Sequence, residues 1–117
     1  MKIPNIFEAD TKTETFTAGA VIFQEGQPGD VMYIVKEGEV DLRVHGKTVE
    51  VVKPDGFFGE MAVIEAGTRS ATAIAKTNCV LMPVNAKRFE FMVHEVPFFA
   101  LHVMKCLSRR LRALNAD

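Results

Sequence analysis

The segment Val40-Asp41-Leu42-Arg43-Val44-His45-Gly46-Lys47 gives the clearest indication of the fold. Its aliphatic residues alternate with Asp41 and Arg43, and successive side chains of a strand point to opposite faces of a sheet. One face of this strand is therefore expected to be apolar and the other polar. Residues 45–47 predict a hairpin loop that leads into a second strand over residues 48–52.

Short segments of the same character, rich in Val, Ile, Phe and Thr, lie on both sides of this hairpin. All eight glycines fall between Gly19 and Gly67, and most of them separate such segments. Many short strands with turns between them indicate a sandwich or barrel, and we expect a jelly-roll of about eight strands over residues 13–84. The further strands are predicted over residues 13–17, 20–24, 31–36, 71–75 and 79–84, with turns at residues 27–30, 53–56 and 76–78.

The C-terminal part of the chain, which has no glycine from residue 68 onward, is predicted to be mostly helical. Asn85 suits the N-cap of a helix over residues 86–94, and Pro97 suits the first turn of a second helix that ends near Leu114. Residues of the second helix recur at spacings of three and four, which predicts an amphipathic stripe that packs against the roll. The members of the stripe are Leu101, Met104, Leu107, Ser108, Leu111 and Leu114.

A second pattern, Phe58-Gly59-Glu60-Met61-Ala62-Val63-Ile64 followed after four residues by Arg69-Ser70-Ala71-Thr72, suits a sugar that carries a cyclic phosphate. A phosphodiester that leaves water needs a permanent positive charge, and Arg69 supplies one in a planar fork of N–H donors. Glu60 offers an ionised acceptor for a ribose hydroxyl, and Gly59 lets the backbone approach a ligand. The residues after this glycine are expected to begin a short helix, whose unpaired N–H groups point at the same anion.

This pattern resembles the phosphate-binding cassette of cyclic-nucleotide-binding domains, which are found in protein kinase A regulatory subunits, cyclic-nucleotide-gated channels and the bacterial catabolite activator protein. The resemblance extends upstream through residues 18–26, 28–30 and 33–40 in the same order, so it covers nearly the whole chain. It implies that Glu60 binds the ribose 2′-hydroxyl and that Arg69 binds the cyclic phosphate. It also implies that backbone amides surround the phosphate, from Gly59, Met61, Ala62, Ser70 and Ala71.

The resemblance implies a switch without chemistry, in which the nucleotide draws in the cassette and shifts the adjoining helices. We expect cAMP rather than cGMP and no cofactor, although Ser70 is intermediate between the threonine of relatives that accept cGMP and the alanine of those that favour cAMP. The second helix would move over the nucleotide or join two copies of the chain, as in relatives. Arg109, Arg110 and Arg112 lie within sequence reach of the base; the alternative is that they are solvated and complement the helix dipole.

The length and charge of the chain limit its partners. The 117 residues fit one domain, and a net charge of −1 gives no sign of a nucleic-acid-binding surface. No run approaches the roughly 18 apolar residues of a membrane span, so we expect a cytoplasmic protein that contacts neither nucleic acid nor membrane directly. The length leaves no room for a DNA-binding or kinase domain, so the expected output is an unknown effector protein or the missing part of a longer chain. Cys79 and Cys106 lie in apolar segments and are expected to be buried free thiols.

Three other classes of function compete with a nucleotide receptor. A metal-dependent enzyme on a jelly-roll needs clustered imidazoles and a carboxylate, but His45, His94 and His102 are scattered along the chain. A transcription factor needs a larger basic patch than the three arginines near the C-terminus provide. The serious rival is a domain of the same fold that binds no ligand and serves in protein interaction, for which replacing Arg69 would change no nucleotide affinity.

Overall fold

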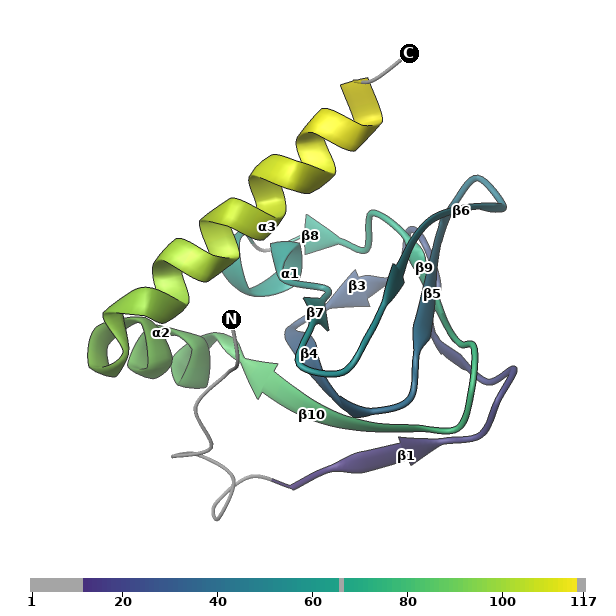
Figure 1. Ribbon diagram of the computed structural model, residues 1–117, viewed down its shortest axis with the longest axis horizontal. Helices are drawn as coiled ribbons and strands as arrows, with labels where there is room; N and C mark the ends of the chain where they lie inside the picture. The colour runs from purple at the N-terminus through teal and green to yellow at the C-terminus, as the bar shows by residue number, and fades with distance from the viewer. Residues whose placement is uncertain (1–11, 66, 116–117) are drawn as a thin grey trace.

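Two four-stranded antiparallel sheets and a helical layer make up the part of the chain described by the computed structural model, residues 12–65 and 67–115 (Figure 1). One sheet has the strand order β1-β10-β4-β7 and the other β2-β9-β5-β6, while β3 pairs with β8 in a separate two-stranded ladder. The strands are β1 (Glu14–Phe16), β2 (Val21–Phe23), β3 (Pro28–Gly29), β4 (Val31–Glu37), β5 (Val40–Val44), β6 (Lys47–Val52), β7 (Phe57–Phe58), β8 (Gly67–Thr68), β9 (Thr72–Ala75) and β10 (Cys79–Asn85). The predicted jelly-roll with C-terminal helices is confirmed.

The strand β4 is buried on both faces, and this position explains its nearly continuous apolar sequence. Tyr33 and Val35 point into a core between the two sheets, where Tyr33 stacks on Phe58 with ring centroids 5.4 Å apart. Met32 and Ile34 point the other way, into a second core that the helices cover. One sheet therefore separates two apolar interiors.

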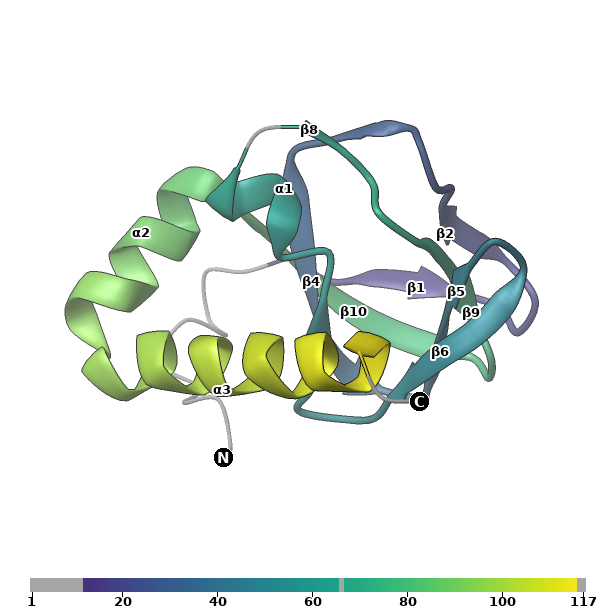
Figure 2. The same cartoon turned by 90° about the horizontal axis from the view of Figure 1, so that it is seen from above.

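Three helices complete the structure: α1 (Met61–Ile64), α2 (Ala86–Glu95) and α3 (Pro97–Asn115). Asn85 caps α2 as predicted, because its side-chain oxygen accepts a hydrogen bond from the backbone N–H of Arg88 at 2.8 Å. Seen from above, α3 runs from α2 along the side of the roll toward β6 (Figure 2). This path brings its C-terminal half beside the cassette, residues 58–72.

The structure corrects two predictions about the strands. Residues 28–29 were expected in a turn, but they form β3, which pairs with β8. Lys47 was expected in the hairpin loop, but it is the first residue of β6, and the turn is made by His45 and Gly46, both with positive φ. Three strands of two residues each bring the number of strands to ten rather than about eight, because such short pairings are set by tertiary contacts rather than by a local pattern.

The amphipathic stripe predicted to pack against the roll is wrong for most of its members. Leu101, Met104, Ser108 and Leu111 are exposed, and only Leu107 packs against the second core. The face of α3 that lies against the roll instead carries Phe99, Val103, Cys106 and Arg110. The helix has apolar residues on both faces, so periodicity alone did not identify the buried one; the side chain of Leu114 lies outside the described residues.

Both cysteines are free thiols, as expected. Cys79 is buried, and burial raises the pKa of its thiol. Cys106 was also expected to be buried, but it is only half-buried because it lies at the edge of the α3 face that meets the roll. Over the ranges 12–65 and 67–115, no helix is long and apolar enough to cross a bilayer.

Candidate functional site

Arg69 directly follows β8 and is a buried cation that has no carboxylate partner among the described residues. Only 7% of the Arg69 surface is exposed, and the guanidinium carbon lies 4.0 Å from the centre of the Phe23 ring. Nη1 donates a hydrogen bond to the Gly59 carbonyl at 3.3 Å, whereas the buried Nε has no hydrogen-bond partner. Burial lowers the pKa of Arg69, while Tyr33 and Asp30 act in the opposite direction. Buried charges are normally paired, so this environment suits an anionic ligand.

Two glycines make room for this guanidinium. A Cβ atom at Gly29 would lie 2.2 Å from Nε of Arg69, and one at Gly59 would lie 2.9 Å from Nη1. Gly59 also has a φ of +78°, which other residues rarely adopt. Gly59 was predicted to let a ligand approach the backbone, and this stays a prediction. In the structure Gly59 makes room for the side chain of Arg69.

Glu60 precedes α1 and is almost fully buried, with 6% of the residue exposed. The amides that follow it are partly engaged within the cassette. Ala62 N–H donates to the Gly59 carbonyl at 3.3 Å, and Val63 N–H donates to the Glu60 carbonyl at 3.1 Å. The Glu60 carboxylate accepts a hydrogen bond from an arginine of α3.

Arg110 reaches from α3 to three elements of the roll. Its Nη1 donates to Oε1 of Glu60 at 2.5 Å, and its Nη2 donates to the Phe57 carbonyl at 2.5 Å. Nε donates to Oε1 of Glu50 at 2.6 Å. Burial tends to lower the pKa of Arg110, but the hydrogen bonds that it donates to Glu50 and the charges of both glutamates outweigh this effect, so the pKa is raised. Arg110 therefore stays positively charged, with two carboxylates around its guanidinium.

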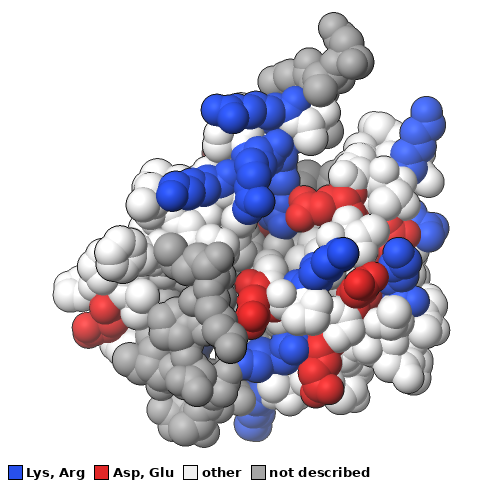
Figure 3. All heavy atoms as spheres, viewed as in Figure 1, with Lys and Arg blue, Asp and Glu red and all other residues white. Residues whose placement is uncertain are grey.

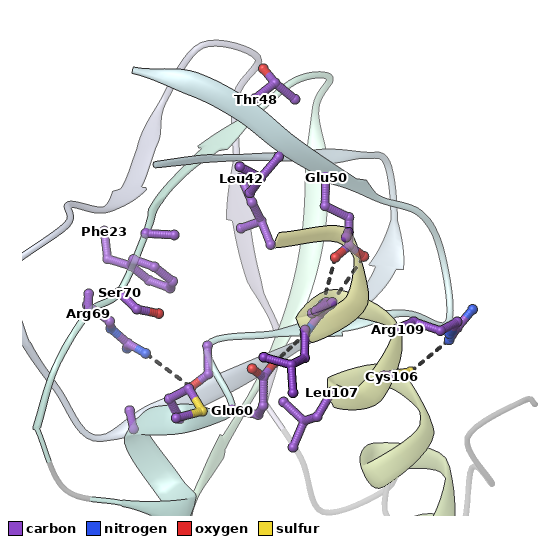
Figure 4. A pocket seen from close by; sticks show the side chains of 18 of the residues that line it. Phe23, Leu42, Thr48, Glu50, Glu60, Arg69, Ser70, Cys106, Leu107 and Arg109 are labelled. Carbon is purple, nitrogen blue, oxygen red and sulfur yellow. Dashed lines mark hydrogen bonds and ion pairs between the residues drawn. The ribbon is translucent and has the colours of Figure 1, made fainter. Parts of the chain in front are cut away.

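A cavity of about 900 Å³ lies between the roll and α3, and its size is that of a small-molecule site (Figure 4). Two glutamates and three arginines supply its charged groups, while apolar side chains supply much of the walls. The structure brings all seven predicted site residues to this cavity: Gly59, Glu60, Met61, Ala62, Arg69, Ser70 and Ala71. The other lining residues are Phe23, Leu42, Thr48, Val49, Glu50, Thr68, Cys106, Leu107, Arg109, Arg110, Leu111 and Ala113.

The three C-terminal arginines divide between the cavity and the surface. Arg110 is turned inward, Arg109 lines the cavity and donates to Sγ of Cys106 at 3.0 Å, and Arg112 is exposed and outside the lining. Sequence reasoning missed Glu50 and Gly29. Glu50 is a polar residue in an otherwise ordinary strand, and 60 residues separate it from Arg110, so no local signal marked it.

The histidines lie apart from one another. His45 is in the β5–β6 hairpin beside Glu25. His102 is in α3 and packs edge-on against the ring of Phe57 on β7. Burial lowers the pKa of His102, and the charges of Arg109 and Lys105 act in the same direction. Within the described ranges, no three residues of the types His, Cys, Asp and Glu are grouped closely enough to hold a metal ion.

Comparison with known proteins gives a consistent result. The family model of the cyclic nucleotide-binding domain matches residues 13–95. The chain is 39% identical over 106 residues to the cyclic nucleotide-gated potassium channel mll3241 of Mesorhizobium japonicum, which covers 90% of this chain and 29% of the channel. It is 31% identical over 107 residues to the cyclic AMP receptor protein of Thermus thermophilus, which covers 87% of this chain and 50% of that protein.

Solved structures share the fold. The catabolite activator protein of Thermus thermophilus superimposes with a TM-score of 0.79 at 30% identity, over 90% of this chain and 52% of that one. The structure of PKAR CBD2 bound to Sp-2Cl-cAMPS superimposes with a TM-score of 0.73 at 23% identity, over 91% of this chain and 73% of that one. The chain thus spans half the length or less of the two relatives matched by sequence. The resemblance seen in the sequence is confirmed, and the chain belongs to the cyclic nucleotide-binding domain family.

Proposed function

We propose that this chain is a single regulatory domain that binds cAMP in preference to cGMP in the cavity beside α3 and acts as an allosteric switch without catalysing a reaction. The observation that carries the proposal is Arg69, a buried guanidinium without a carboxylate partner among the described residues. The monoanionic cyclic phosphate of the ligand would supply the missing negative charge. The phosphate would lie beside Phe23 and the glycines that surround the guanidinium.

Glu60 and the apolar walls account for the rest of the ligand. The Glu60 carboxylate would accept a hydrogen bond from the ribose 2′-hydroxyl, and the described residues supply no hydrogen-bond partner to its Oε2. Leu42 on β5 and Leu107 and Leu111 on α3 would enclose the purine. The preference for cAMP is supported by the name of the Thermus relative, a cyclic AMP receptor protein, and by the absence of threonine at residue 70.

The output would pass through α3, because this helix contacts the cavity on one face and solvent on the other. Its outer face carries exposed Leu101 and Met104 beside basic residues, and Lys and Arg gather over its C-terminal half (Figure 3). We propose that a second copy of the chain covers the apolar part of this face and that an effector or output domain responds to its movement.

The proposal is tested by titration calorimetry of the purified chain with cAMP and cGMP. We expect Arg69→Ala to lower the affinity for cAMP by roughly thirty- to a few thousand-fold, because the phosphate would lose its buried partner, a cost of about 2 to 5 kcal/mol. Arg112→Ala, which removes an exposed arginine outside the cavity lining, is the matched control and should bind like the wild type.

The same titration distinguishes the rival function. A ligand-free interaction domain would give no binding heat with either nucleotide and no change in melting temperature. Equal affinity of the wild type and Arg69→Ala would reject the phosphate assignment even if a nucleotide binds.

A further inference from the structure

Among the described residues, the cavity lining has two carboxylates, Glu50 and Glu60. The proposed function assigns Glu60 to the ribose and gives Glu50 no role. Glu50 lies on β6, across the cavity from the cassette, and its side chain is 35% exposed. Both of its carboxylate oxygens accept hydrogen bonds from Arg110, at 2.6 Å from Nε and at 3.3 Å from Nη2. A bidentate pairing of this kind fixes the direction of the guanidinium as well as its distance.

Arg110 is consequently held from two sides. Glu50 approaches it from β6 and Glu60 approaches it from the start of α1 (Figure 4), while the Phe57 carbonyl on β7 accepts a further bond. The Phe57 ring also lies 5.3 Å from the guanidinium carbon. All of these contacts hold α3 against the roll, and none of them requires a bound nucleotide.

The way Arg110 divides its hydrogen bonds between Glu50 and Glu60 determines how much of the Glu60 carboxylate is engaged. Arg110 uses Nη1 for Glu60 and uses Nε and Nη2 for Glu50, so each glutamate meets a different edge of the guanidinium. If Glu50 were neutral, Glu60 would be the only carboxylate bound to the guanidinium, and the arginine would be free to turn toward it. The Glu60 oxygen that the proposed function assigns to the ribose would then be drawn into the ion pair.

We propose that Glu50 is a positioning residue of the nucleotide site. It anchors Arg110 so that α3 is docked across the cavity before any nucleotide binds, and it keeps one Glu60 oxygen directed at the ribose. The docking of α3 by Glu50 requires no nucleotide, whereas the effect on the Glu60 oxygen that faces the ribose rests on the proposed function.

Hydrogen exchange without nucleotide tests the anchoring. We expect amides of residues 104–113 to exchange several-fold faster in Glu50→Gln than in the wild type, because the charged anchor of α3 is lost. Glu39→Gln is the matched control: its side chain is 33% exposed and pairs with Lys76 at 3.8 Å, and it does not line the cavity. Equal exchange of α3 in the two variants and the wild type would overturn the proposal.

Calorimetry with cAMP and 2′-deoxy-cAMP tests the link to the ribose. We expect Glu50→Gln to lower the affinity for cAMP by about tenfold and that for the deoxy compound by less, so that the wild-type preference for the 2′-hydroxyl shrinks. If Glu50→Gln keeps the wild-type ratio of the two affinities, this link is overturned, since a general loosening of the site would weaken the binding of both nucleotides equally. If the wild type binds neither nucleotide, the proposed function fails, while the exchange experiment still decides whether Glu50 anchors α3.

Discussion

Gly29 shows how one missing side chain can decide whether a distant residue functions. The guanidinium of Arg69 occupies the space into which a Cβ at this position would project. The neighbour that would have to move is a side chain rather than backbone, so a substitution should displace Arg69 while the fold is kept. The proposed affinity for the phosphate thus depends on a residue that would not itself touch the phosphate.

Gly29→Ala is therefore expected to weaken cAMP binding by roughly ten- to a hundredfold, because the phosphate partner is displaced. Calorimetry measures the affinity, and the melting temperature checks the fold. Gly67→Ala is the matched control, since Gly67 lies opposite Gly29 in the β3–β8 ladder and a Cβ there meets open space. If the two alanine variants bind equally well, Gly29 does not position Arg69.

Single residues could be found from the sequence only where a local pattern marked them. Arg69 and Glu60 stand in one short segment whose chemistry suits a cyclic phosphate, and the structure brings both to the same cavity; their roles in binding stay predictions. Glu50 carries no such mark, and the pattern around Gly29 predicted only a turn, with no role at the site. Their importance arises from the closure of the roll and the docking of α3, which place them beside arginines far away in the sequence.

At the scale of elements, α3 shows why an apolar pattern can mislead. Phe98 and Phe99 are neighbours in the sequence, but Phe98 is 68% exposed and Phe99 is 1% exposed. Phe99 lies in the second core, with its ring edge-on to Phe89 at 5.7 Å. The predicted stripe began at Leu101 and followed mostly the outer face, because the inner face includes a half-buried arginine, Arg110, that an apolar pattern does not count.

The two phenylalanines provide a direct test of this assignment. Phe99→Ala is expected to lower the free energy of unfolding by about 3 to 5 kcal/mol, because it leaves a cavity in a packed core. Phe98→Ala should change it by less than about 0.5 kcal/mol. Urea unfolding followed by circular dichroism measures both values, and comparable losses in the two variants would mean that α3 docks by another face.

The strands of seven, six and five residues were predicted within one or two residues, whereas β3, β7 and β8 were not predicted at all. Alternation of polar and apolar residues needs several positions to be visible. A pair of two-residue strands such as β3 and β8 forms because the segments on either side bring them together.

For the whole molecule, the exposed apolar face of α3 is the feature that bears on assembly. Met104→Glu is expected to convert a dimer into a monomer, because it places a charge at the centre of the proposed contact. Light scattering coupled to size exclusion measures the mass. Val21→Glu, which alters an exposed apolar residue on β2, should leave the mass unchanged; a wild-type chain that is already monomeric at high concentration would rule out the dimer.

The double burial of β4 limits how the helices can move against the roll. Its side chains fill one interior on each side, so a slip of one residue against β10 would exchange Tyr33 and Ile34 between them. The sheet that contains β4 is therefore held in one register by both cores, and the helices pack on one of its faces. A movement of α2 and α3 is therefore expected to leave the register of β4 and β10 unchanged and to alter only how Met32 and Ile34 pack against the helices.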